Sequence, residues 1–242
     1  MALPSGWKTP IIGQAEAYVR QQLMAGGIDS SHDWWHVERV RTLALSLAAE
    51  EGLPAEDLET VELGALLHDI GDWKYSGSEK AGPAAARAFL QENGYGEAGT
   101  SAVLEVVEGV GFKDELAGGR GGGGQECSPA LRVVQDADRL DAIGAIGIAR
   151  CLTFGGAFKR VLHDPTLAAR PELTKEKYMK GGQEQTTINH FYEKLLKLKG
   201  LMKSEAGRRR AEQRHAYMQE FLEQFFGEWE GAKVSWAWPG SP

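Results

Sequence analysis

The sequence predicts an all-α protein, and two observations favour this class. Apolar residues recur three and four positions apart in successive segments, which is the spacing of one helix face. Serine, proline and glycine residues stand between these segments, where they are typical of helix starts and ends. Hydrophobic residues make up 42% of the 242 positions and charged residues 25%, as in an ordinary folded domain. We therefore expect one helical domain over residues 1–242.

The first 110 residues predict five helices. The expected segments are a helix over residues 11–25, a second that follows a cap at Ser30 or Ser31 and ends at Gly52, a third that begins at Pro54, and two more over residues 83–91 and 97–110. The last of these is rich in valine, which also favours strands, but its valines recur at helical spacing. In the third helix His68 shares a face with Leu58 and Val61, so we expect it to be buried.

The second half predicts three longer helices. Ser128 and Pro129 begin a long helix that continues through Arg150. Six of the seven residues 118–124 are glycine; this run lacks the Gly-Lys-Ser/Thr ending of a phosphate-binding loop and predicts a surface loop. The remaining expected segments are irregular stretches at 155–156 and 163–171, a helix that Thr186 or Thr187 caps and that ends near Gly200, a last helix that begins at Ser204, and an irregular tail over 231–242.

Charge and cysteine content narrow the class of protein. The net charge of −7 argues against a surface built mainly to neutralise nucleic-acid phosphates. Cys127 and Cys151 lie far apart and predict neither a disulfide framework nor a cysteine zinc site. No secretory signal and no run of about 18 apolar residues is visible, so we expect a cytoplasmic protein without a membrane span. An organellar location after removal of a transit peptide stays open.

The pair His68-Asp69 is the strongest candidate for chemistry. His-Asp dipeptides occur three times, also at 32–33 and 163–164, so the dipeptide alone has little specificity. Only His68-Asp69 ends a strongly apolar helix. Neighbouring residues in a helix point about 100° apart, but at a helix end both side chains can reach one ion.

Three segments in a fixed order carry a family resemblance. His36-Val-Glu-Arg-Val40, Leu67-His-Asp-Ile-Gly-Asp72 and Asp136-Ala-Asp-Arg-Leu-Asp141 resemble the motifs of the HD-domain metal-dependent phosphohydrolases. This resemblance implies an HD-domain helical bundle with additional C-terminal helices. It also implies a metal core at about 28–150 and a helical extension at about 151–230. The implied metal ligands are His36, His68, Asp69 and one of the three late aspartates.

Helix geometry helps to choose the last ligand. Asp136 lies about 160° around the axis from Asp138, whereas Asp141 lies only about 60° away, so Asp136 and Asp138 do not face one metal. The resembling Ala-Asp-Arg-Leu string favours Asp138, and Val134, Ala145 and Ile148 indicate that it faces the core. Asp141 is then a candidate to hold a ligand in place or to orient a water molecule on the substrate side, and Asp136 and Asp141 stay alternative ligands.

Other polar residues are candidates for catalysis and substrate binding. Asp72 either stops the helix or moves a proton beside the metal, with Asp69 as its catalytic neighbour. Cations are needed to hold phosphate groups. The expected substrate-binding residues are Arg39, Lys74, Lys113, Asp141, His190 and Lys194. Each of these residues also has a simpler structural interpretation. Arg39 would form an ion pair, His190 would be a hydrogen-bonded core histidine, and each lysine would lie in solvent.

The resemblance implies a metal-dependent phosphohydrolase. Histidine with carboxylate suits one divalent ion, with Mn favoured and Mg, Co, Ni, Fe or Zn also compatible. Thr187–Leu196 and the helix over 208–226 resemble a bacterial-type subgroup that contains a nucleoside triphosphate pyrophosphohydrolase. We therefore expect hydrolysis of a nucleoside (deoxy)triphosphate to the monophosphate and pyrophosphate. The alternatives are a phosphomonoesterase, a nucleotide phosphodiesterase, or a non-catalytic metal-stabilised regulatory domain. A nucleotide or another phosphorylated small molecule is the expected partner, and the apolar helices allow a homodimer.

Overall fold

A computed structural model describes residues 8–25, 33–71, 78, 80–111, 127–170 and 186–231. These residues form helices and connecting turns without any strand, which confirms the all-α prediction. The elements are α1 (Pro10–Ala25), α2 (Trp34–Glu51), α3 (Ala55–Leu67), α5 (Ala81–Glu92), α6 (Glu97–Gly109), α8 (Pro129–Asp141), α9 (Gly144–Ala157), α11 (Asn189–Glu193), the 3-10 helix η1 (Leu195–Leu201) and α12 (Glu205–Trp229).

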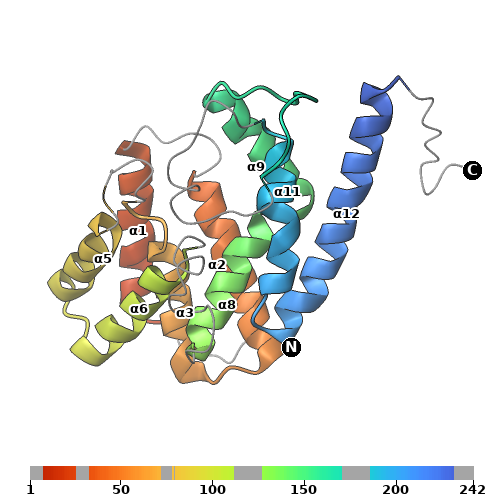
Figure 1. The fold of residues 1–242 in the computed structure, drawn as a ribbon. Helices are drawn as coiled ribbons and strands as arrows, with labels where there is room; N and C mark the ends of the chain where they lie inside the picture. Colours follow the sequence, from red (N-terminus) through yellow and green to blue (C-terminus); the bar gives the residue numbers. More distant parts are fainter. Residues whose placement is uncertain are drawn as a thin grey trace, which may run out of the picture.

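Helices α2, α3 and α8 form the centre of the bundle. In Figure 1, α1, α5 and α6 lie on one side of this centre and α12 lies on the other. One apolar core joins α2 and α8 to α9 and α12, with Leu47, Leu140 and Met218 among its members. A second core joins α3 to α1, α5 and α6, with Leu67 and Phe89 among its members. Both α2 and α3 have residues in each of the two cores. Side chains at the ends of these helices are therefore held on a rigid frame.

The start of α2 differs from the prediction. Its N-cap is Asp33, whose side chain accepts a hydrogen bond from the backbone N–H of His36 at 3.1 Å. The expected caps, Ser30 and Ser31, lie outside the described residues. Asp33 is as good a cap as serine, and it places His36 in the first helical turn. Gly52 ends α2 in the left-handed conformation at φ +70°, as the sequence predicts.

The long helix predicted through Arg150 is wrong. The chain bends by 67° between α8 and α9, and Gly144 adopts φ +73° at the bend. A Cβ atom at Gly147 would overlap the backbone carbonyl of Ala142, so this glycine permits the close turn. The bend also leaves Ala145 exposed, which removes it from the face that was expected to point toward the core.

Two more segments depart from expectation. Gly155 and Gly156 lie inside α9, where Gly155 packs against Thr187, so this stretch is not irregular. The helix expected to end near Gly200 is interrupted at Lys194, whose φ is −134°, and continues as the 3-10 helix η1. The glycine run at 118–124 and the tail at 232–242 lie outside the described residues.

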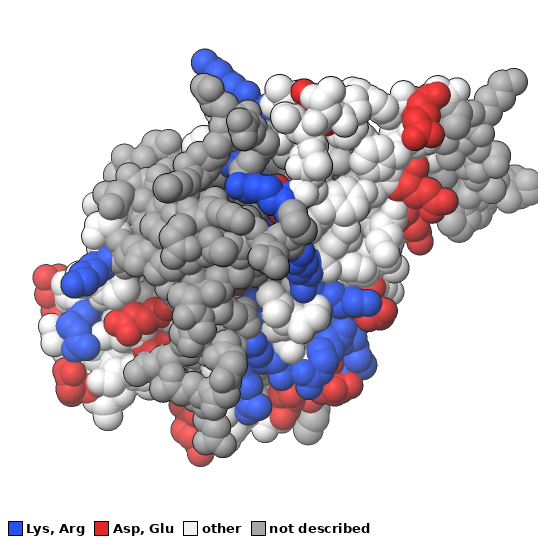
Figure 2. All heavy atoms as spheres, in the orientation of Figure 1, with Lys and Arg blue, Asp and Glu red and all other residues white. Residues whose placement is uncertain are grey.

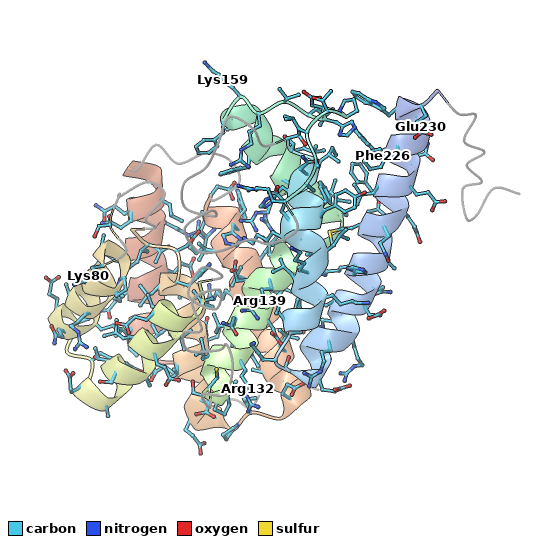
Figure 3. The ribbon with its side chains drawn as sticks, in the orientation of Figure 1. Lys80, Arg132, Arg139, Lys159, Phe226 and Glu230 are labelled. Carbon is cyan, nitrogen blue, oxygen red and sulfur yellow. The ribbon has the colours of Figure 1, made fainter. Side chains whose placement is uncertain are left out.

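The C-terminal helix is attached to α8 by buried polar contacts. Ser204 caps α12 as predicted, and its hydroxyl accepts from the Gly207 N–H at 2.9 Å. Arg139, labelled in Figure 3, donates to the Leu201 carbonyl at 2.6 Å just before this cap. α8 therefore supports the start of α12 while its other face carries the candidate site.

Within the described ranges, no single helix is long and apolar enough to cross a membrane. α8 and α9 reach that length and hydropathy only as a bent pair. Leu131, Val134 and Leu140 of α8 are buried in the core of the bundle.

Candidate metal centre

His36 presents one ring nitrogen to the candidate site. Its side chain is 2% exposed, and its Nδ1 lies 2.8 Å from Oδ2 of Asp141. A carboxylate accepts hydrogen bonds, so Nδ1 carries the proton and Nε2 keeps its lone pair in the neutral ring. Burial and the nearby charge of Arg150 lower the pKa of His36, although the hydrogen bond with Asp141 opposes this change. The lowered pKa keeps the ring neutral at pH 7.

His68 presents the same nitrogen from the opposite direction. It is the C-cap residue of α3, and its Nδ1 lies 2.7 Å from the carbonyl oxygen of Ala65. A carbonyl only accepts, so this contact fixes the proton on Nδ1 and leaves the Nε2 lone pair toward His36. The two Nε2 atoms are 3.4 Å apart. His68 is half-buried rather than fully buried as expected, because it lies at the C-terminal end of α3, where its ring meets His36.

Two carboxylates approach the same nitrogen of His36. Oδ2 of Asp69 lies 3.7 Å from Nε2, and Oδ1 of Asp138 lies 3.5 Å from it. His36, His68 and Asp69 offer ligand atoms that all lie within 4.8 Å of one another. Asp138 is not a member of this tighter group and stands at its edge with a side chain that is 31% exposed. The structure thus brings together the four residues predicted as ligands.

The donor set fits a divalent cation. Two neutral imidazole nitrogens that face each other with lone pairs do not bond to one another, whereas a cation between them satisfies both. Asp69 and Asp138 add negative charge on the same side. Two imidazoles and two carboxylates suit a borderline to hard divalent ion and leave open positions in an octahedral shell.

Asp141 lies behind His36 among cations. Its carboxylate is 1% exposed and accepts from Arg39 Nε at 2.7 Å and Nη2 at 3.1 Å, and from Arg150 Nη1 at 3.0 Å. Burial alone would raise the pKa of this carboxyl group, but the bonds from His36 and Arg39 and the charge of Arg150 hold it well below its usual range. Both oxygens are therefore occupied by protein donors, and Asp141 faces His36 rather than open space.

Asp136 faces the other side of α8. Its oxygens accept from the Lys203 N–H at 2.8 Å, the Ser204 N–H at 2.7 Å and the Ser204 hydroxyl at 2.6 Å. This position agrees with the helical spacing, which puts Asp136 almost opposite Asp138. Asp136 holds the start of α12 and lies away from the two histidines.

The remaining predicted residues are less closely placed. Asp72, Lys74 and Lys113 lie outside the described residues. His190 is half-buried on α11 and is not part of the three-residue group around His36. Lys194 is half-buried where α11 meets η1, and its charge acts on the Cys151 thiol of α9. The substrate-binding roles of these residues stay predictions.

Sequence reasoning missed two arginines. Arg150 of α9 reaches Asp141, and Arg214 of α12 donates to the carbonyl of Leu140 at the end of α8. A positive side chain at a helix C-terminus stabilises the exposed carbonyls there. The sequence signal for this arrangement is the pair Gly144 and Gly147. Two glycines within six residues after Asp141 indicate a break rather than a continuous helix.

Comparisons with known proteins place this geometry in a family. The HD domain family model matches residues 34–143, a span that contains His36, His68, Asp69 and Asp138. YpgQ, an uncharacterised protein of Bacillus subtilis, is 36% identical over 196 residues, which cover 81% of this chain and 83% of the relative.

Solved structures agree in fold. A protein from Lactobacillus plantarum superposes with a TM-score of 0.79 at 33% identity over 93% of this chain and 100% of that chain. An HD-superfamily hydrolase from Bacillus thuringiensis gives 0.68 at 37% identity over 91% and 97%. YpgQ in complex with ADP gives 0.66 at 29% identity over 90% and 97%. This chain belongs to the HD-domain family of metal-dependent hydrolases.

Proposed function

We propose that this hydrolase cleaves a nucleoside (deoxy)triphosphate to the monophosphate and pyrophosphate, with one Mn²⁺ ion as the favoured metal. The observation that carries the proposal is the pair of Nε2 atoms 3.4 Å apart, with two aspartates beside them and both Nδ1 atoms already bonded. Such a site is built to hold a cation with open positions, as phosphate hydrolysis requires.

In this proposal the ion is held by His36 and His68 through Nε2 and by Asp69 and Asp138 through carboxylate oxygens. When bound, a divalent ion supplies Lewis-acid polarisation of a phosphoryl oxygen and lowers the pKa of a water molecule. The protein fixes the two imidazoles in one tautomer and keeps their faces apart, with ring centroids 5.3 Å apart and planes at 73°.

Other residues of the chain bind and move protons in the proposed reaction. Asp72, three residues after Asp69 in the sequence, is proposed to accept or return a proton. The guanidinium of Arg39 is oriented by Asp141 and remains 34% exposed, so its outer edge faces an incoming phosphate. Lys74, Lys113 and Lys194 are proposed to add positive charge for the rest of the phosphate chain, and His190 to contact a phosphate or the base.

Two observations support a nucleotide as the substrate. A relative of similar fold, YpgQ of Bacillus subtilis, forms a complex with ADP. The second is the charge of the chain: its net charge is −7, and Figure 2 shows Asp and Glu side chains among the Lys and Arg side chains on the face in view. Lys199 pairs with Glu212 and Arg208 with Glu205. An acidic chain with mixed surface charges favours a small anion held at the metal over a long nucleic acid.

The proposal is tested by screening purified protein against nucleotides with each candidate metal and identifying the products. We expect pyrophosphate and a nucleoside monophosphate, with the highest rate in Mn²⁺. Orthophosphate alone would indicate a phosphomonoesterase, and a cleaved diester would indicate a phosphodiesterase. Absence of turnover across the panel, with metal and nucleotide both bound, would overturn the proposal and favour a regulatory binding domain.

A further inference from the structure

Asp141 is the most crowded charged group beside the candidate metal centre. Its carboxylate contacts donors of three residues from two helices: His36 Nδ1 and Arg39 of α2, and Arg150 of α9. Oδ2 lies 2.8 Å from the imidazole, 3.1 Å from Arg39 Nη2 and 3.0 Å from Arg150 Nη1, while Oδ1 accepts from Arg39 Nε at 2.7 Å. Rotation of the carboxylate would break contacts to both arginines, so its orientation is fixed.

The bend after α8 is what brings Arg150 to this carboxylate. In a straight helix, residues nine positions apart lie about 13 Å apart along the axis and about 180° apart around it. Arg150 would then point away from Asp141. The 67° turn, with Gly144 at φ +73°, returns α9 toward the end of α8 and allows the 3.0 Å contact.

We propose that Asp141 is a positioning residue that holds His36 in the Nδ1-protonated tautomer, and that Arg39 and Arg150 hold Asp141 in place. This inference rests on the proposed metal site, in which His36 offers Nε2 to the ion. Metal-binding histidines generally donate their second ring N–H to a partner that fixes their orientation and raises their basicity. Helix α9 therefore contributes to the centre through Arg150.

The two histidines are held by different kinds of hydrogen-bond partner. His68 donates to a backbone carbonyl, which no side-chain substitution removes. His36 depends on a side chain, and that side chain depends on two cations. Loss of Asp141 should therefore disturb His36 and leave the tautomer of His68 unchanged.

Asp136 offers a matched control on the same helix. It is buried like Asp141 and also accepts several hydrogen bonds, but its partners belong to the start of α12 and not to the metal centre. Asp141→Asn and Asp136→Asn each replace one buried carboxylate of α8 by an amide of the same size. A merely structural role for Asp141 predicts similar behaviour of the two variants.

The experiment measures Mn²⁺ affinity by titration and the histidine tautomers of the metal-free protein by long-range ¹H–¹⁵N correlation spectra. For Asp141→Asn we expect Mn²⁺ affinity to fall about 10- to 100-fold and His36 to lose its single Nδ1–H tautomer. Asp136→Asn should keep both wild-type values at a lower melting temperature. The proposal is overturned if Asp141→Asn keeps both, or if Asp136→Asn changes them equally.

Arg150 variants keep the proposal testable if Asp141→Asn does not fold. Arg150→Met should weaken Mn²⁺ binding several-fold, and Arg150→Lys, which keeps the charge, should restore part of the loss. Equal affinities in wild type and Arg150→Met would contradict the role of Arg150. Both readouts are independent of turnover, so a protein that binds Mn²⁺ as expected but hydrolyses no nucleotide would contradict only the proposed function.

Discussion

Two charged clusters lie along α2 and use their charges differently. Around Arg41, the guanidinium donates to Glu62, which is fully buried, and to Glu16 at 3.0 Å and Glu38 at 3.3 Å. Around His36, two imidazole nitrogens and two aspartates meet at one point. The first cluster pairs a guanidinium with carboxylates, and the second gathers two imidazole nitrogens and two carboxylates at one point.

Buried charge alone does not identify a functional site. His36 and Arg41 are five positions apart on α2, so they face directions about 140° apart and belong to separate surroundings. Arg41 and Glu62 tie α2 to α3 as an ion pair. Only the His36 cluster combines neutral nitrogen donors with carboxylates, which is the chemistry of a metal centre.

The largest effect is expected at Asp138. Asp138→Ala should lose bound Mn²⁺ and reduce hydrolysis by about 10³-fold, because the Lewis-acid contribution of a metal is worth several kcal/mol. Metal content after desalting and initial rates check this expectation. A purified variant that keeps a full metal load would show that Asp138 is not a ligand.

Substitution of Arg41 should lower the stability of the fold and leave metal binding unchanged. Among the described residues, Arg41→Met leaves the buried Glu62 carboxylate with Lys8, 3.9 Å away, as its charged partner, and should cost about 3 kcal/mol in the free energy of unfolding. Urea unfolding measures this cost. Metal content per folded chain should equal that of wild type, and a loss of metal would mean that the two clusters are coupled.

Removal of the metal should produce a moderate and reversible change. Binding at 100 times the dissociation constant stabilises a protein by about 2.7 kcal/mol, so chelation should lower the melting temperature by about 5–10 °C. Re-addition of Mn²⁺ should restore it. The same shift is expected in Arg41→Met, whereas Asp138→Ala should show none; a shift in that variant would place the metal elsewhere.

A surface ion pair should matter least. Arg209 of α12 donates to Glu50 of α2 at 3.1 Å, and its side chain is mostly exposed. Arg209→Ala should change the free energy of unfolding by less than about 1 kcal/mol, because solvent screens such pairs. A loss above this limit in urea unfolding would show that the contact between α12 and α2 contributes more than an ordinary exposed ion pair.

Much of the fold was predictable because its signals are local. Helices α1, α3, α5 and α6 follow from apolar spacing and from glycine and proline at their ends, and the ordered segments at His36, His68 and Asp138 indicated which side chains to bring together. Each of these signals lies within about one or two helical turns.

The rest depends on contacts between distant segments. The bend after Asp141 is supported by Arg214, 74 positions away, which donates to the Leu140 carbonyl. The contact between Arg150 and Asp141 exists only because of that bend. Spacing along one helix does not contain such information.

Anomalous diffraction at the manganese absorption edge tests the central claim most directly. Crystals grown with Mn²⁺ should give one strong anomalous peak per chain, in contact with His36, His68, Asp69 and Asp138. The same map from Asp141→Asn crystals should show a weaker peak at an unchanged position. A peak that lacks contact with both histidines, or no peak beside them, would contradict the metal centre described here.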